Sequence, residues 1–223
     1  MCKTSPDKEN YKYSLACAYD GNNQTDEAIS IIEDLLAVNI NSIQLKLHLA
    51  SLYNKKGRNE AAKIIYYDLI NSGVSNINVL YEYAVLCAKT NETDKAEEML
   101  KRIIDMDPSF ALAYKDLAII YMSRRFFDRA DEYFKKAYKV EPDNIFINFE
   151  YGNYFHLMSN FENAKKMYNK VLKMKNVPVY MLINISMNYI SMNMLNKAKS
   201  ILLDIINKEP QNIEILYNLA HIY

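Results

Sequence analysis

Alanine recurs six times at an unbroken spacing of 34 residues, and this period constrains the fold more than any other feature of the chain. The six positions are Ala28, Ala62, Ala96, Ala130, Ala164 and Ala198. A fixed period of this length is typical of arrays in which one supersecondary unit is copied and each copy packs on its neighbours. The chain is therefore predicted to be an array of repeats, with a core formed by a series of local interfaces.

Composition indicates that the repeated unit is helical. Half of the 223 residues are apolar, whereas only 4 glycines and 5 prolines are present, too few for a fold rich in tight turns and hairpins. The 27 basic and 27 acidic residues cancel, so the chain has no net field to hold nucleic acid or an anionic membrane. Neither is expected as a partner, unless lipidation at Cys2 attaches the chain to a membrane.

The three cysteines predict neither a metal site nor a disulfide framework. Cys2, Cys17 and Cys87 lack the spacing of metal ligands, and pairing two of them would leave the third over. The first ten residues contain no apolar signal core, and no stretch reaches the roughly 18 apolar residues of a membrane helix. A reducing, cytoplasmic location is predicted. The alternative is a periplasmic lipoprotein anchored through Cys2 as its acylated residue.

Residue spacing divides each repeat into two helices. When the recurring alanine is numbered position 20, position 8 is always alanine, glycine or serine, and positions 24 and 27 are apolar. The apolar positions trace one helical stripe on each side of a turn at positions 14 to 18. Two helices are therefore predicted to cross at the small positions 8 and 20. Asp, Asn and Thr in the turn are predicted to cap the second helix.

This register predicts a polar tail over residues 1–8 and an array over residues 9–223. The repeats are 9–42, 43–76, 77–110, 111–144, 145–178 and 179–212, followed by a terminal first helix at 213–223.

The pattern resembles the tetratricopeptide repeat over nearly the whole chain. The repeat at 111–144 carries the signature most completely, with Tyr114, Leu117, Ala118, Tyr121, Ala130, Phe134, Ala137 and Pro142 in the family's places. The resemblance implies an all-α fold, a right-handed superhelical solenoid of antiparallel helix pairs. It also implies that the first helices line a concave groove.

In that geometry, positions 2, 5, 6, 9, 12 and 13 of each first helix face the groove and are the candidates for partner binding. The expected binding residues are Tyr81, Glu82, Lys115, Asp116, Ile119, Phe146, Phe149, Glu150, Asn153, Tyr180, Asn184, Tyr217 and Asn218. Large rings exposed in a groove would anchor a peptide. The acids at position 6 would favour a neutral or basic segment, although such a row is also typical of a solvated helix face. Asn184 and Asn218 would hold a peptide backbone through their amide groups.

No catalytic constellation is found. His48, His156 and His221 lie in separate repeats and are too far apart to share a metal. We predict a non-enzymatic scaffold, without cofactor or metal, that binds an extended or helical segment of a partner protein. One alternative is the substrate-docking repeat region of a larger enzyme such as a glycosyltransferase. Another is an envelope lipoprotein that aids pilus or cell-wall assembly.

The lysines of the second helices are predicted to solvate the convex side, with a nucleic-acid face as the alternative. They are Lys135, Lys136, Lys165, Lys166, Lys173 and Lys175.

The C-terminal end is predicted to leave apolar side chains uncovered. Leu216, Leu219, Ala220 and Tyr223 would pack on the preceding repeat, whereas Ile215 and Ile222 would face a second helix that the sequence does not contain. Repeat arrays need a polar cap over their last apolar face. Either the chain is a fragment of a longer protein, or this end self-associates with another chain.

Overall fold

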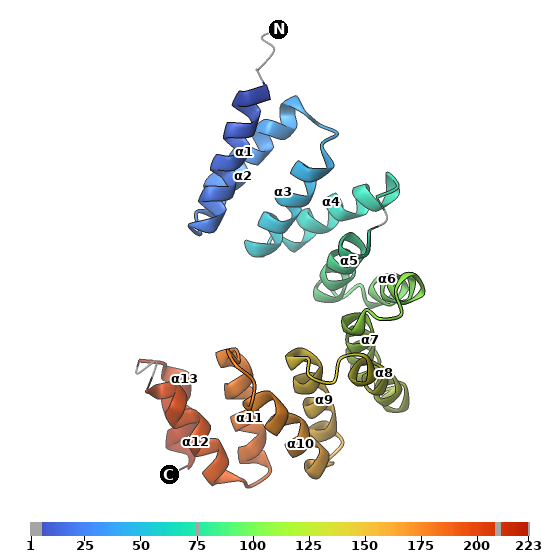
Figure 1. Cartoon of the computed structure of the whole chain (residues 1–223). Helices are drawn as coiled ribbons and strands as arrows, with labels where there is room; N and C mark the ends of the chain where they lie inside the picture. Colours follow the sequence, from blue (N-terminus) through green and yellow to red (C-terminus); the bar gives the residue numbers. More distant parts are fainter. Residues whose placement is uncertain (1–5, 75, 208–210, 223) are drawn as a thin grey trace. The chain divides into compact units, whose positions relative to one another are not determined.

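The computed structural model describes residues 6–74, 76–207 and 211–222, and within these ranges the chain forms thirteen α-helices and no β-strand (Figure 1). It divides into two compact units, one ending at Pro108 and one beginning at Ser109. The predicted all-α architecture of helix pairs is confirmed. Among the described residues, none of the helices has the length and apolar character needed to cross a membrane.

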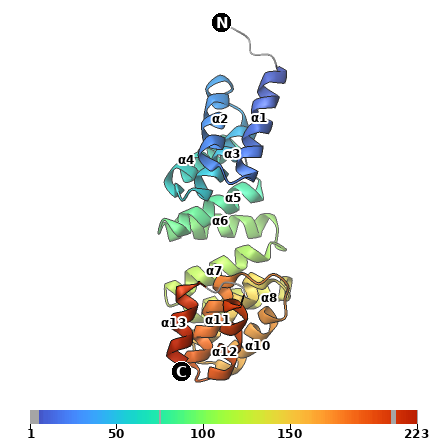
Figure 2. The ribbon, with the colours of Figure 1, turned by 90° about the vertical axis from the view of Figure 1, so that its left-hand side faces the viewer.

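Unit 1 contains three helix pairs, which follow the first three repeats. They are α1 (Pro6–Gly21), α2 (Thr25–Val38), α3 (Ile43–Lys55), α4 (Asn59–Asn71), α5 (Ile77–Lys89) and α6 (Thr93–Met106). Each helix packs on the next along the chain (Figure 2). Helix α1 begins at Pro6, inside the segment predicted as a polar tail, and Cys2 lies outside the described residues.

Unit 2 contains three further pairs and one terminal helix. They are α7 (Ala111–Ser123), α8 (Phe127–Val140), α9 (Ile145–Leu157), α10 (Phe161–Leu172), α11 (Val179–Ser191), α12 (Leu195–Ile206) and α13 (Ile213–Ile222). The two helices of each pair pack on each other, and α13 packs on α12 and α11. Helices α6 and α8 end two residues before Pro108 and Pro142, because proline cannot continue the backbone hydrogen bonds of a helix.

The small positions of the repeat form the crossing points of the pairs, as predicted. All six recurring alanines at position 20 expose 0% of their surface. The large residues at position 24 are also buried in every repeat: Ile32, Tyr66, Leu100, Phe134, Tyr168 and Leu202. Helix axes can approach closely only where one side chain is small, and the neighbouring large side chain then fills the space.

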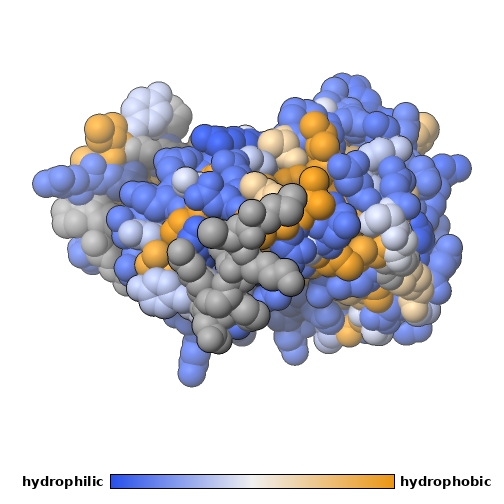
Figure 3. All heavy atoms as spheres, turned by 90° about the horizontal axis from the view of Figure 1, so that it is seen from above, coloured by the Kyte–Doolittle hydropathy of each residue, from blue (hydrophilic) through white to orange (hydrophobic). Residues whose placement is uncertain are grey.

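Polar side chains cover most of the face drawn in Figure 3, with apolar ones visible between them.

The turn within each repeat is closed by the backbone. Position 15 has a positive φ, between 55° and 73°, in all six repeats: Asn23, Gly57, Asn91, Arg125, Ser159 and Asn193. The N–H of the following residue donates to the carbonyl five residues earlier, over 2.8 to 2.9 Å in every repeat. A residue with left-handed backbone angles, followed by a backbone hydrogen bond that spans five residues, forms the Schellman motif that ends a helix.

Side-chain capping of the second helices was therefore a wrong expectation in most repeats. Among the described second helices, only α10 has a side-chain cap, in which Asn160 Oδ1 accepts from the Asn163 N–H over 3.3 Å. Helices α2, α4, α6, α8 and α12 have none. The backbone turn connects the helices without needing a particular side chain.

Replacing Arg125 by glycine is expected to stabilise unit 2 by about 0.5–1 kcal/mol. Arg125 is exposed and holds φ at 63°, where a Cβ adds steric cost that glycine avoids. Asn193, at the same position with φ 57°, is the matched control, because asparagine tolerates this conformation better than arginine does. Denaturant midpoints of both variants test the idea, and an equal or larger gain from Asn193→Gly would contradict it.

Candidate functional site

Two neighbouring first helices of unit 2, α9 and α11, carry six of the predicted binding residues. Phe146, Phe149, Glu150 and Asn153 lie on α9, and Tyr180 and Asn184 lie on α11. The rings of Phe149 and Tyr180 meet edge to face, with centroids 6.2 Å apart. We call the surface formed by Phe146, Glu150, Asn153, Tyr180, Asn184 and Asn188 the first-helix face.

One predicted anchor is not available for binding. Phe149 exposes only 4% of its surface and belongs to a core cluster with Met181 and Ile185 of α11. The expectation that its ring is exposed was wrong, because the ring fills the space where α11 packs on α9. Phe146 and Tyr180 remain accessible, with 44% and 58% of their surfaces exposed.

A chain of hydrogen bonds joins α9, α10 and α11 beneath this face. Asn153 Nδ2 donates to Glu150 Oε2 over 3.3 Å, and Tyr168 O–H donates to Asn153 Oδ1 over 3.0 Å. Asn188 Nδ2 donates to Tyr168 Oη over 2.7 Å, and also to Asn153 Oδ1 over 3.2 Å and to Asn184 Oδ1 over 3.1 Å. Side chains from three helices are thereby held in one polar network.

The Glu150 carboxylate determines which side-chain groups of this network donate hydrogen bonds and which accept them. An ionised carboxylate only accepts hydrogen bonds, so Asn153 turns its NH₂ group towards Glu150 and its oxygen towards Tyr168 and Asn188. Asn188 then turns its NH₂ group inwards, which leaves its oxygen outside the network. Asn184 uses its oxygen inside the network, which leaves its NH₂ group outside. Among the described residues, neither Asn188 Oδ1 nor Asn184 Nδ2 has a hydrogen-bond partner.

A glycine lets the Tyr168 hydroxyl reach the network from the second helix. Tyr168 is fully buried on α10, and its ring passes Gly152 of α9. A Cβ at residue 152 would lie 2.5 Å from Tyr168 Cε1, closer than real Cβ contacts allow. Glycine at residue 152 therefore leaves the space that the Tyr168 ring occupies.

Charges from α7 reach the same network. Lys115 Nζ lies 2.7 Å from Asp116 Oδ1, and both side chains are mostly buried. Burial raises the pKa of Glu150, while the Asn153 hydrogen bond and the Lys115 charge oppose that rise. Glu150 is a half-buried carboxylate, and its two oxygens can accept further hydrogen bonds besides the one from Asn153.

The other predicted site residues are more dispersed. Ile119 of α7 is half-buried, and Tyr217 of α13 exposes 72% of its surface. Asn218 is buried, with 6% exposed, and does not present its amide to a partner as expected. Tyr81 and Glu82 lie half-buried on α5 in unit 1, where Asn54 Nδ2 donates to Glu82 Oε2 over 3.5 Å.

The packing of the terminal helix also differs from the prediction. Ile215 is fully buried against Ile183, Leu202, Ile205 and Leu219, whereas Leu216 exposes 48% of its surface. Helix α13 therefore turns Ile215 towards the preceding repeat, where Leu216 was predicted. The side chains of Ala220, His221, Ile222 and Tyr223 lie outside the part of the chain that the structure describes.

Sequence reasoning missed two residues of the network, Asn188 and Tyr168. Asn188 is at position 10 of its repeat, outside the positions assigned to the groove, and Tyr168 is at the core position 24. The sequence feature that could have pointed to Tyr168 is the combination, in one repeat, of a glycine at position 8 with a tyrosine at position 24. No group of three or more His, Cys, Asp or Glu residues able to hold a metal occurs among the described residues.

Two repeats match the family model of the tetratricopeptide repeat, over residues 77–110 and 147–177. The first match coincides with the third predicted repeat, and the second lies within the fifth. The chain contains tetratricopeptide repeats. No curated protein sequence matches it.

Solved structures share the fold of this chain. PilF of Pseudomonas aeruginosa is 16% identical with a TM-score of 0.69, and the match covers 96% of this chain and 97% of PilF. A tetratricopeptide repeat protein of Parabacteroides merdae is 13% identical with a TM-score of 0.73, covering 96% and 85%. TTC0263 of Thermus thermophilus is 18% identical with a TM-score of 0.70, covering 81% and 98%. These identities support the shared solenoid fold alone.

Proposed function

We propose that this tetratricopeptide repeat protein binds an extended segment of a partner protein across the first-helix face of α9 and α11. The fold is that of a protein-interaction scaffold in general. The observation that carries the finer proposal is the direction of the hydrogen-bond network. It leaves one donor, Asn184 Nδ2, and one acceptor, Asn188 Oδ1, without a partner among the described residues, on successive turns of α11.

An extended segment suits this pair better than a helical one. Each peptide group of an extended chain has a free C=O and a free N–H, which match the unpaired donor and acceptor. A helix has already used these groups in its own backbone, except at its ends. The network also holds both amides in place before binding, which lowers the entropy that binding costs.

Side-chain preferences come from the neighbouring residues. The exposed rings of Phe146 and Tyr180 offer apolar contacts to the bound segment, as aromatic anchors do at many interfaces. Glu150 disfavours an acidic residue and favours a neutral or basic one at the adjacent position. The predicted roles of Lys115, Asp116 and Ile119 are limited to the edge of this surface on α7.

The scaffold acts without catalysis of its own in this proposal. The alternatives remain a substrate-docking region of a larger enzyme and an envelope lipoprotein attached through Cys2. A cytoplasmic location stays part of the proposal. The PilF similarity concerns the fold and assigns no compartment to this chain.

Peptides selected from a displayed random library on the wild-type protein would test this function. We expect Asn188→Ala to weaken the selected peptides roughly five- to thirtyfold, because one hydrogen bond of about 1–2 kcal/mol is lost. Asn196→Ala removes an exposed asparagine of α12 and is the matched control, expected to bind like the wild type. Equal binding by both variants, or selection of peptides that bind as helices, would contradict the proposal.

Ester substitution in the selected peptide identifies the backbone contact directly. Replacing one peptide amide by an ester removes a single N–H donor and leaves the side chains unchanged. One ester position should weaken binding to the wild-type protein and have little further effect on Asn188→Ala. If no ester position couples to Asn188, the backbone is not the recognised group.

A further inference from the structure

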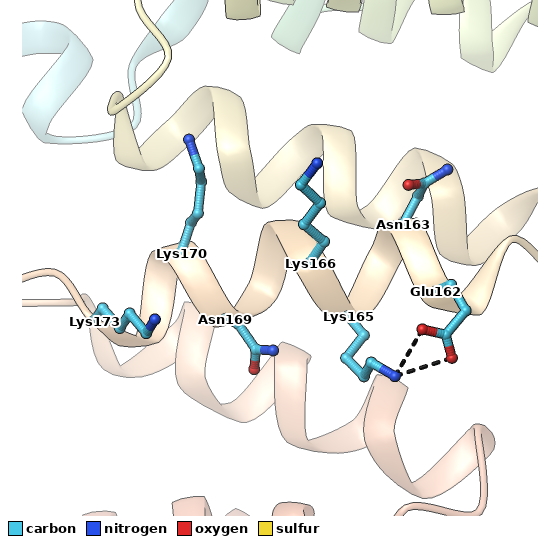
Figure 4. Close-up of a pocket in the computed structure, with 7 residues that line it drawn as sticks. All are labelled: Glu162, Asn163, Lys165, Lys166, Asn169, Lys170 and Lys173. Carbon is cyan, nitrogen blue, oxygen red and sulfur yellow. Dashed lines mark hydrogen bonds and ion pairs between the residues drawn. The ribbon is translucent and has the colours of Figure 1, made fainter.

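The outer surface of α10 and the residues after it concentrate positive charge. Residues 161–175 contain five lysines and one glutamate, although the whole chain is neutral. Four of these lysines line an open pocket of about 520 Å³ together with Glu162, Asn163 and Asn169 (Figure 4). The pocket lies on a second helix, whereas the first-helix face is formed by α9 and α11.

The lining side chains form two rows along the helix. Figure 4 shows Asn163, Lys166 and Lys170 pointing to one side of α10, Lys165 and Asn169 pointing to the other, and Lys173 at the C-terminal end of the helix. The surface between the rows is open to solvent. We call this surface, with its two rows, the lysine trough.

Part of the positive charge in the trough is not neutralised by the residues that the structure describes. Lys165 pairs with Glu162 over 2.8 Å, and Lys170 lies 3.6 Å from Asp143 and donates to Tyr138 Oη over 2.7 Å. Lys166, in the first row, and Lys173, at the end of the helix, are exposed and have no ion-pair partner among the described residues. Like charges four residues apart, such as Lys166 and Lys170, destabilise a helix. A bound anionic group would remove that cost.

We propose that the lysine trough binds an acidic segment of a protein, with its carboxylates placed between the two lysine rows. Lysine ammonium groups and the amide groups of Asn163 and Asn169 all donate hydrogen bonds, which carboxylate oxygens accept. None of the seven lining residues is aromatic, so the trough offers no surface on which bases stack. None is apolar, so it has no side chain to insert into a membrane. The proposal does not depend on the function assigned to the first-helix face.

Fluorescence anisotropy with a labelled peptide of alternating glutamate and alanine tests this site on the full chain. The variant Lys166→Gln/Lys173→Gln should bind roughly tenfold more weakly than the wild type. Lys135→Gln/Lys136→Gln removes the same charge from α8, where both lysines are paired with acids of their own helix, and should stay within about twofold. Binding should weaken as the salt concentration rises, because the contacts are exposed.

Three results would overturn the proposal. The first is no measurable binding of the acidic peptide to the wild-type protein at low salt. The second is an equal loss in the two double variants, which would indicate a response to net charge alone. The third is tighter, Lys166- and Lys173-dependent binding of a single-stranded oligonucleotide or of phosphatidylserine vesicles. Circular dichroism of both variants checks that these surface substitutions leave the fold intact.

Discussion

Replacing Phe134 by alanine is expected to lower the free energy of unfolding of unit 2 by about 3–5 kcal/mol. Phe134 is fully buried at position 24 of its repeat and stacks on Tyr151 with ring centroids 5.1 Å apart. It also contacts Tyr154 of the next first helix, at 5.5 Å. One ring therefore joins α8 to α9, and its removal leaves a cavity at the interface between two repeats.

Two controls separate this cavity from the general effect of losing a ring. Phe134→Leu keeps most of the buried volume and should cost less than about 1.5 kcal/mol. Phe126→Ala removes a phenylalanine that is 53% exposed and should change stability by well under the effect of Phe134→Ala.

Urea denaturation followed by circular dichroism measures the total effect. Hydrogen exchange locates it, since amides of α8 and α9 should exchange faster and those of α1 to α6 should be unchanged. A loss below about 1 kcal/mol for Phe134→Ala would show that this ring does not hold the repeats together.

Replacing Gly152 by alanine is expected to destabilise unit 2 by about 1–3 kcal/mol, although alanine is the better helix former by about 1 kcal/mol. The new Cβ would lie 2.5 Å from Tyr168 Cε1 and 2.7 Å from Tyr168 Cδ1. The ring is fully buried, so it cannot move away from the new Cβ without disturbing its neighbours in the core. Its displacement would break the hydrogen bonds to Asn153 and Asn188, so affinity for a peptide bound by the first-helix face should fall as well.

A double-mutant cycle with Tyr168→Leu tests the cause. In that background, Gly152→Ala should be neutral or stabilising by up to about 1 kcal/mol, because the clash is gone and only the helix propensity remains. The third repeat already combines these residue types, with Ala84 and Leu100 both buried. Additive effects of the two substitutions would rule out the ring contact as the source of the destabilisation.

The helix pairs and their crossing points could be predicted from the sequence because they depend on residue spacing. The alanines at position 20 and the large residues at position 24 recur every 34 residues and are buried in every repeat. Each repeat packs mainly on its neighbours, so the local pattern contains most of the information about the core. The same pattern correctly placed Phe146 and Tyr180 on an exposed surface.

Only the tertiary structure decided how side chains of different helices meet. Phe149 is buried because α11 packs over it, and Ile215 rather than Leu216 faces the preceding repeat. The network that orients Asn184 and Asn188 joins side chains of α9, α10 and α11. Tyr168 and Asn153 bond although they are 15 positions apart in the sequence, and Asn188 and Asn153 bond although they are 35 apart. Periodicity assigns a residue to one side of its own helix. The rotation and approach of the neighbouring helix determine whether that side is open, buried or bonded.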